Sequence, residues 1–147
     1  MKFPVGTVAG HYKAAVAENP ERDIVRFDNQ KLNWTLREFD RYSSAFAFGL
    51  LEQGYRKGDS LVMYADQTAS AEQLVAQMGA IKAGVKVVTF VEDTEEALDN
   101  ALKATNATGL IFSPDAQVSE NQTRANIVQK LMPELSTMYL GDELAVR

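Results

Sequence analysis

The sequence predicts an α/β fold: a mostly parallel sheet with flanking helices, preceded by a helix and a short β-hairpin. From residue 61 onward, segments with helical spacing of apolar residues alternate with short apolar runs, which favours parallel strands joined by helices. Two helices of the chain end at a glycine, Gly54 and Gly84, the usual left-handed stop. The length of 147 residues favours one domain, 1–147, and is sufficient to bury a core.

The amino-terminal segment predicts a helix followed by a hairpin. Apolar residues recur at helical spacing over residues 7–18, and Asn19-Pro20 stops that helix. Short strands at 24–27 and 31–34 then flank Asp28-Asn29, a pair that favours a tight turn. We therefore expect two antiparallel strands here.

A second helix begins at a capping box formed by Thr35 and Glu38. The Thr35 hydroxyl can accept the backbone N–H of Glu38, and the Glu38 carboxylate can accept the backbone N–H of Thr35. Gly54 ends this helix, residues 57–59 turn the chain, and 61–64 form a strand. The apolar stripe of the helix consists of Leu36, Phe39, Tyr42, Phe46 and Leu50.

The helix and strand pattern then repeats three times. We expect helices at 69–83, 93–105 and 121–131, and strands at 85–91, 110–112 and 137–140. Gly84 ends the first of these helices, and Asp93 with Glu96 caps the second. The residues expected to face inward are Leu74, Val75, Met78 and Ile81, then Leu98, Ala101 and Leu102, then Ile127, Val128 and Leu131.

Composition excludes several classes of function. The net charge of −5 argues against a nucleic-acid partner and against an anionic membrane surface. The absence of cysteine excludes disulfides and thiol chemistry, and the single histidine, His11, excludes a two-histidine metal site. No apolar run is long enough to span a bilayer, and the amino terminus resembles neither a signal nor a transit peptide. We expect an intracellular protein.

Three features could suggest a site, and each has a structural interpretation. His11 is interpreted as a half-buried helical residue, and the acidic run 92–96 as helix capping, since acids favour a helix N-terminus. Phe39, Tyr42, Phe46 and Phe48 are interpreted as packing residues. The chain has no phosphate-binding glycine loop and no serine nucleophile elbow. A binding hypothesis remains for Tyr64–Gln67, because open α/β sheets place ligands at strand carboxyl ends.

Two joints carry a resemblance to a known family. Trp34-Thr35, Gly54, Gly58-Asp59 and Val62 follow one another in order, and the later stretch "QLVAQMGAIKAGVKVVTFVED" contains Ala80, Lys82-Ala83-Gly84 and Val88. This pattern resembles the opening of the adenylate-forming (AMP-binding) superfamily, which includes acyl-CoA synthetases, luciferases and nonribosomal peptide adenylation domains. Thr89 stands where that family usually has proline, and the resemblance covers residues 5–142.

The resemblance implies part of the large N-terminal domain of an ATP-dependent acyl-adenylating enzyme. The family's phosphate loop, a Ser/Thr/Gly-rich run ending in Pro-Lys, normally lies just past the last residue here, and its adenine-binding, ribose-binding and catalytic lysine residues lie later still. No catalytic, cofactor-binding or metal-binding residue is therefore carried over, and we expect no enzyme activity and no cofactor for this chain.

Three functions follow as hypotheses. The first is a non-catalytic structural or accessory subunit derived from an acyl-CoA synthetase-like domain. It would sit in a larger multi-subunit complex, with the mitochondrion favoured over the cytoplasm. Few helices are available to cover both sheet faces, so partner subunits would cover the remaining sheet surface. The second is the N-terminal fragment of an active acyl-CoA synthetase or adenylation enzyme. The third is a small nucleotide- or acyl-binding module that uses Tyr64–Gln67, including Asp66, and residues 91–93.

Overall fold

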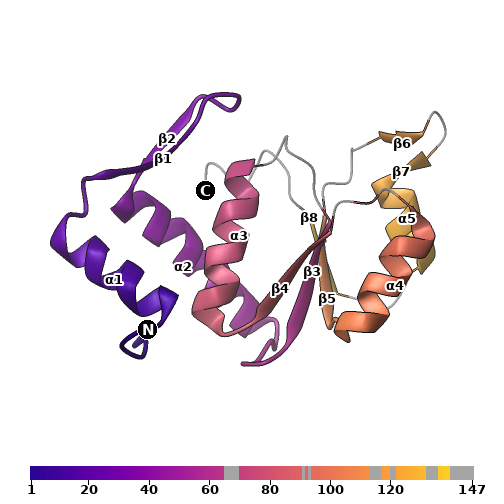
Figure 1. Ribbon diagram of the computed structural model, residues 1–147, viewed down its shortest axis with the longest axis horizontal. Coiled ribbons are helices and arrows are strands. Elements are labelled where there is room, and N and C mark those ends of the chain that lie inside the picture. The colour runs from indigo at the N-terminus through magenta and orange to yellow at the C-terminus, as the bar shows by residue number, and fades with distance from the viewer. Residues whose placement is uncertain are drawn as a thin grey trace. The chain divides into compact units, whose positions relative to one another are not determined.

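The structure is a computed structural model, and it describes residues 1–64, 70–90, 92, 94–112, 117–119, 122–131 and 136–139. The chain divides into two compact units (Figure 1). The first unit contains Met1–Gly58 and Leu74–Val85, and the second contains Asp59–Gln73 and Lys86–Arg147. Helix α3 (Ser70–Ala83) contributes residues to both units.

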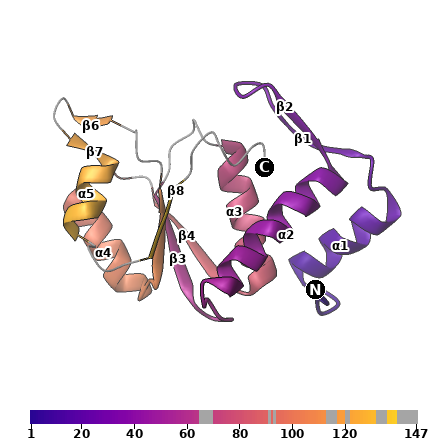
Figure 2. The ribbon, with the colours of Figure 1, turned by 180° about the vertical axis from the view of Figure 1, so that it is seen from behind.

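The first unit contains the predicted helix, hairpin and second helix (Figure 2). Thr7 caps α1 by accepting the Gly10 N–H. The hairpin is antiparallel, with Phe27 opposite Leu32. Both halves of the capping box form at Thr35 and Glu38. The elements are α1 (Val8–Glu18), β1 (Asp23–Phe27), β2 (Leu32–Thr35) and α2 (Leu36–Glu52).

Aromatic rings fill the core of the first unit. Phe39 on α2 meets Tyr12 on α1 edge to face, with ring centroids 5.6 Å apart, and stacks on Trp34 at 6.2 Å. Leu36, Phe39 and Leu50 are buried, and Tyr42 and Phe46 are partly buried, so the predicted stripe of α2 is confirmed.

The prediction that Ile81 faces inward is wrong, because its side chain is 44% exposed. The buried positions of α3 in the first unit are mostly small residues, such as Ala80 and Ala83. A Cβ added at Gly79 would lie 2.7 Å from both the Phe46 ring and the Ser43 carbonyl oxygen. Helices α2 and α3 therefore meet along small residues of α3, which leaves the larger Ile81 outside the contact.

The second unit contains a four-stranded parallel sheet in the order β4-β3-β5-β8. Helices α4 and α5 pack against each other on one face of this sheet (Figure 1). A short antiparallel pair, β6 with β7, precedes α5. The elements are β3 (Ser60–Tyr64), β4 (Lys86–Phe90), α4 (Glu95–Thr105), β5 (Gly109–Phe112), β6 (Gln117–Ser119), β7 (Gln122–Thr123), α5 (Arg124–Leu131) and β8 (Ser136–Tyr139).

The central strands β3 and β5 are buried along their whole length. Alternate residues of a strand face opposite sides, so both sheet faces are covered at these two strands. The edge strand β4 differs, because Val87, Val88 and Phe90 are only partly buried. Among the strands of this four-stranded sheet whose burial is described, the expected uncovered surface is therefore confined to β4.

Two helix starts differ from the sequence prediction. The N-cap of α4 is Thr94, whose hydroxyl accepts the Ala97 N–H at 3.2 Å, so the predicted cap by Asp93 with Glu96 is wrong. Helix α5 begins at Arg124 and not at residue 121, because the two residues before it belong to β7. Asp93 and Asn121 themselves lie outside the described residues.

Backbone hydrogen bonds join the amino-terminal ends of the strands in the second unit. Lys86 N–H donates to the Asp59 carbonyl at 2.8 Å, and Thr108 N–H donates to the Ser60 carbonyl at 2.8 Å. The Thr108 hydroxyl donates to the same Ser60 carbonyl at 3.1 Å. These bonds fix the loops that enter β4 and β5 relative to the start of β3.

Candidate functional site

The strand order places a topological switch point between β3 and β5, since the chain passes from β3 to one neighbour and then crosses to the other. Aromatic residues end the four strands there. Tyr64 pairs in register with Phe90 and with Phe112, and Phe112 pairs with Tyr139. This carboxyl edge is where an open α/β sheet places a ligand.

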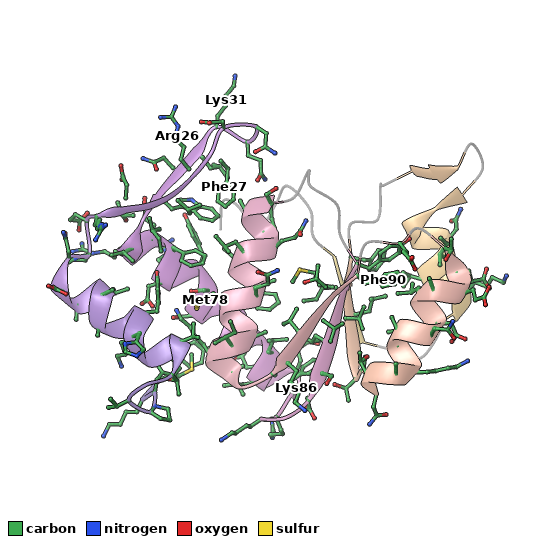
Figure 3. All side chains as sticks on the ribbon, viewed as in Figure 1. Arg26, Phe27, Lys31, Met78, Lys86 and Phe90 are labelled. Carbon is green, nitrogen blue, oxygen red and sulfur yellow. The ribbon has the colours of Figure 1, made fainter. Side chains whose placement is uncertain are left out.

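Three aromatic residues of this edge, Tyr64, Phe90 and Phe112, belong to the core or pack against it. Tyr64 and Phe112 are buried in a cluster with Leu98 of α4 and Ile127 of α5. Phe90 packs against the same cluster, and its ring centroid lies 5.5 Å from that of Tyr64 (Figure 3). Their side chains support the sheet, while Ala65–Gln67 and the positions 91 and 93 lie outside the described residues. The binding hypothesis for this edge stays a prediction.

The acidic run 92–96 supports the helix, as predicted, at the positions that are described. Glu95 and Glu96 lie in the first turn of α4, where the helix dipole favours negative charge. Glu95 also forms an ion pair with Lys130 of α5 at 2.8 Å. Among the described residues, no group of three or more acidic or histidine side chains could hold a metal ion.

His11 and the aromatic residues of α2 also fit structural roles. His11 is exposed, so the prediction of a half-buried histidine is wrong. It lies on α1 next to the buried Tyr12, on the side of the helix that faces solvent. Phe39, Tyr42 and Phe46 are buried or partly buried as packing residues, whereas Phe48 is 52% exposed and packs least.

A buried lysine, Lys82 near the end of α3, is the most unusual polar group of the first unit. Its side chain is 1% exposed, and its Nζ donates to Asp40 Oδ1 at 2.8 Å. Nζ also lies within hydrogen-bonding distance of Ser43 Oγ at 2.7 Å, Ser44 Oγ at 2.9 Å and the Asp40 carbonyl at 3.2 Å. The Tyr12 ring faces the same ammonium, with its centroid 5.2 Å away.

Burial and charge oppose each other at this cluster. Burial lowers the pKa of Lys82, and the hydrogen bond and charge of Asp40 partly offset that effect. Burial also raises the pKa of Tyr12, with a smaller contribution from the Asp40 charge. The Tyr12 hydroxyl donates to the Leu36 carbonyl at 2.7 Å, so both polar groups are hydrogen-bonded within the core.

The Lys82 cluster can hold helices together, and its ammonium has no N–H left over for a ligand. An ammonium has three N–H donors, and four oxygen atoms surround this one. In the sequence, Lys82 stands out only as part of the family motif. The signal that it is buried was its position seven residues after Val75, on the same face of the helix. Its partners on α2 carry no such signal.

Comparison with known proteins identifies the family. The sequence pattern of the AMP-binding enzyme family matches residues 12–146. The chain belongs to the AMP-binding enzyme family. A relative, the protein named as acyl-CoA synthetase YngI in Bacillus subtilis (strain 168), is 30% identical over 123 residues. That alignment covers 83% of this chain and 22% of YngI.

Solved structures of adenylate-forming enzymes share the fold. VinN superposes with a TM-score of 0.77 at 18% identity, covering 95% of this chain and 34% of VinN. A long-chain-fatty-acid CoA ligase from Rhodopseudomonas palustris gives 0.73 at 19% identity, covering 92% of this chain and 33% of the ligase. The o-succinylbenzoate CoA synthetase of Bacillus subtilis gives 0.72 at 16% identity, covering 92% and 26%. The chain thus spans about a fifth to a third of the length of these relatives, and its fold matches their N-terminal domain.

No helix in the described part of the chain combines the length and the apolar character needed to cross a bilayer.

Proposed function

We propose that this chain supplies the non-catalytic scaffold of an ATP-dependent acyl-activating enzyme, the part on which ATP-binding and acyl-binding segments are assembled. The observation that supports this best is the use of Lys82. Among the motif residues, Lys82 has the side chain best suited to take part in a reaction. Its ammonium is instead surrounded by four protein oxygens. Two other motif residues are also structural: Gly84 ends α3 with a φ of 77°, and Val62 is buried in the sheet.

The scaffold can be completed in two ways. In the first, the same polypeptide supplies the segments that bind ATP and the acyl group, and the identity to YngI supports this arrangement. In the second, the chain is an accessory subunit and a partner subunit contributes those segments or covers the sheet, within a mitochondrial or cytoplasmic complex. The partly exposed apolar residues of β4 support a covering partner.

Pyrophosphate exchange tests the scaffold role. The 147-residue chain would be incubated with ATP, magnesium, labelled pyrophosphate and a panel of short, medium, long and aromatic carboxylic acids. We expect no exchange above the protein-free background with any acid. Exchange that disappears in Lys82→Met, with the circular dichroism spectrum unchanged, would contradict the proposal, because Lys82 would then be a catalytic residue.

Native purification from the source distinguishes the two arrangements. Mass spectrometry of intact complexes would show whether the sequence occurs within a longer polypeptide or as a subunit of a larger particle. The longer polypeptide supports the first arrangement, and ATP-dependent acyl transfer should then be assayed with it. A defined particle supports the second, and its composition and subcellular fraction identify the partner and the compartment.

A further inference from the structure

An open groove of about 350 Å³ lies in the first unit, between an amino-terminal arm and the end of α3. The arm is defined here as residues 1–7, and it folds back beside the first turn of α1 (Figure 2). Ile81, Ala83 and Gly84 line the groove from the end of α3, and Ala9 lines it from α1. Its volume is at the lower end of the range of small-molecule sites, about 300–1,000 Å³.

The arm is held in place by several contacts, so this wall of the groove is formed in advance. Lys13 Nζ donates to the Met1 carbonyl at 2.6 Å and lies 5.8 Å from the centroid of the Phe3 ring. The Thr7 hydroxyl donates to the Pro4 carbonyl at 2.8 Å. That carbonyl lies close to Gly10, where an added Cβ would be only 2.5 Å from its oxygen.

The groove carries positive charge in an acidic protein. Lys2 and Lys57 line it, both are exposed, and neither forms an ion pair within the part of the chain that the structure describes. The residues that line it include no aspartate or glutamate, although the whole chain has a net charge of −5. The third lysine in the lining, Lys82, is already paired with Asp40.

The stem of Lys57 lies across Gly84, which has no side chain to displace it. A Cβ at Gly84 would be 3.1 Å from the Lys57 Cγ. Below the lysines, the groove offers apolar surface that water contacts, because Ile81 is 44% exposed and Met1 is 40% exposed. The lysine cations match an anionic head group, and the accessible apolar side chains beside them match an apolar tail.

We propose that this groove binds a monomeric amphiphilic anion, a medium-length apolar chain that ends in a carboxylate or a phosphate. The apolar tail of the ligand would lie against Ile81 and Met1, and its anionic head group would lie between Lys2 and Lys57. This site goes beyond the scaffold role and does not depend on it.

Titration of the whole protein with four probes that each carry a ten-carbon chain tests the proposal. Decanoate, decyl phosphate, decanol and decyltrimethylammonium would each be added below the concentration at which they self-associate, with calorimetry and amide chemical shifts as readouts. We expect saturable one-to-one binding of the two anions, at least ten-fold tighter than decanol, and no binding of the cation. Chemical shifts should change first at the amides of Ile81 and Gly84.

Charge reversal supplies matched variants. Lys2→Glu with Lys57→Glu should weaken decanoate binding by at least ten-fold. Lys31→Glu with Lys86→Glu reverses the same number of charges at two exposed positions outside the groove and should leave decanoate binding within two-fold (Figure 3). Gly10→Ala should also weaken binding, because it displaces the arm while adding a better helix former. Circular dichroism would confirm that each variant is folded.

Several results would overturn the proposal. Anions that bind no tighter than decanol, or shifts that map away from the groove in the wild-type chain, would each exclude the site. Equal loss in Lys31→Glu with Lys86→Glu would show that only net charge matters. Binding to anionic phospholipid vesicles with no response to the monomeric probes would show that this face meets a membrane surface and not a single amphiphile.

Discussion

The first unit buries a charge, whereas the hydrophobic cluster beneath α4 and α5 in the second unit is made entirely of apolar and aromatic side chains. The hydrogen bonds of Lys82 are directional and allow one arrangement of α3 against α2. Apolar packing depends on the buried area and on shape, so it restricts the relative orientation of two elements less strictly. Stability in the second unit therefore comes from apolar burial, while the first unit gives up some stability to fix the arrangement of α3 against α2. Four predictions test this difference.

Leu98→Ala should have the largest effect. Leu98 is fully buried in the cluster of the second unit, so its truncation removes apolar burial and leaves a cavity. The free energy of unfolding should fall by about 3 kcal/mol, within the usual range for this change. Phe48→Ala is the control, because Phe48 is 52% exposed and should cost less than about 0.5 kcal/mol. Urea denaturation measures both, and equal losses would contradict the assignment of the core.

Lys82→Met should cost less, about 1–2 kcal/mol, because Asp40 remains partly solvated and the methionine stem keeps much of the packing. Lys103→Met removes an exposed lysine that pairs with Asp99 on the same helix and should cost less than about 0.5 kcal/mol. Urea denaturation again gives the values. If Lys82→Met stabilises the chain and leaves the α2 and α3 amide shifts unchanged, the lysine does not fix their geometry.

Thr94→Ala should cost about 1 kcal/mol, since it removes the oxygen that accepts the Ala97 N–H at the start of α4. Thr94→Ser keeps that oxygen and should remain within a few tenths of a kcal/mol of the wild type. Thermal unfolding compares the two variants. No loss in Thr94→Ala would show that another residue caps the helix.

Glu38→Gln tests the smallest effect, through pH. The Thr35 backbone N–H, followed by the Thr35 hydroxyl, lowers the pKa of Glu38 below its ordinary value of 4.5. The charged carboxylate is therefore favoured in the folded chain, and its contribution is present above pH 4.5 and lost as the pH falls through the folded-state pKa. Melting temperatures between pH 7 and pH 3 should fall less in Glu38→Gln than in the wild type. Parallel profiles would contradict this.

Much of the fold could be predicted from sequence because its signals are local. The capping box at Thr35 and Glu38 depends on residues three apart, and the glycine stops at Gly54 and Gly84 depend on single residues with positive φ. The α2 stripe follows from regular spacing along one helix. The parallel sheet follows from the alternation of helices with apolar strands.

The errors arose where a contact with another element decides the outcome. Ile81 has suitable spacing for the inward face, but the close approach at Gly79 turns smaller residues toward α2. Asp93 and Thr94 are both good caps by composition, and only the backbone selects between them. The β6–β7 pair replaces the start of a predicted helix because pairing between two short polar strands leaves little trace in hydrophobic periodicity.

The candidate site was less predictable than the fold. The carboxyl edge of the sheet was identified from the position of β3 alone, and the strand order that makes it a switch point could not be read from the chain. The Lys82 cluster required knowing that α2 and α3 are neighbours. Its partners Asp40, Ser43 and Ser44 resemble ordinary polar positions on a helix.

The hydrogen bonds at the amino-terminal edge of the second unit have a consequence for mutational tolerance. Lys86 and Thr108 are tied to Asp59 and Ser60 mainly through backbone groups, which every residue except proline supplies. A scan of all single substitutions should therefore find Lys86, an exposed position, permissive to nearly every residue but proline. Buried Tyr64 and Phe112, at the opposite ends of the strands, should accept few replacements. The loops that enter β4 and β5 could therefore be changed in sequence while the strands stay in place.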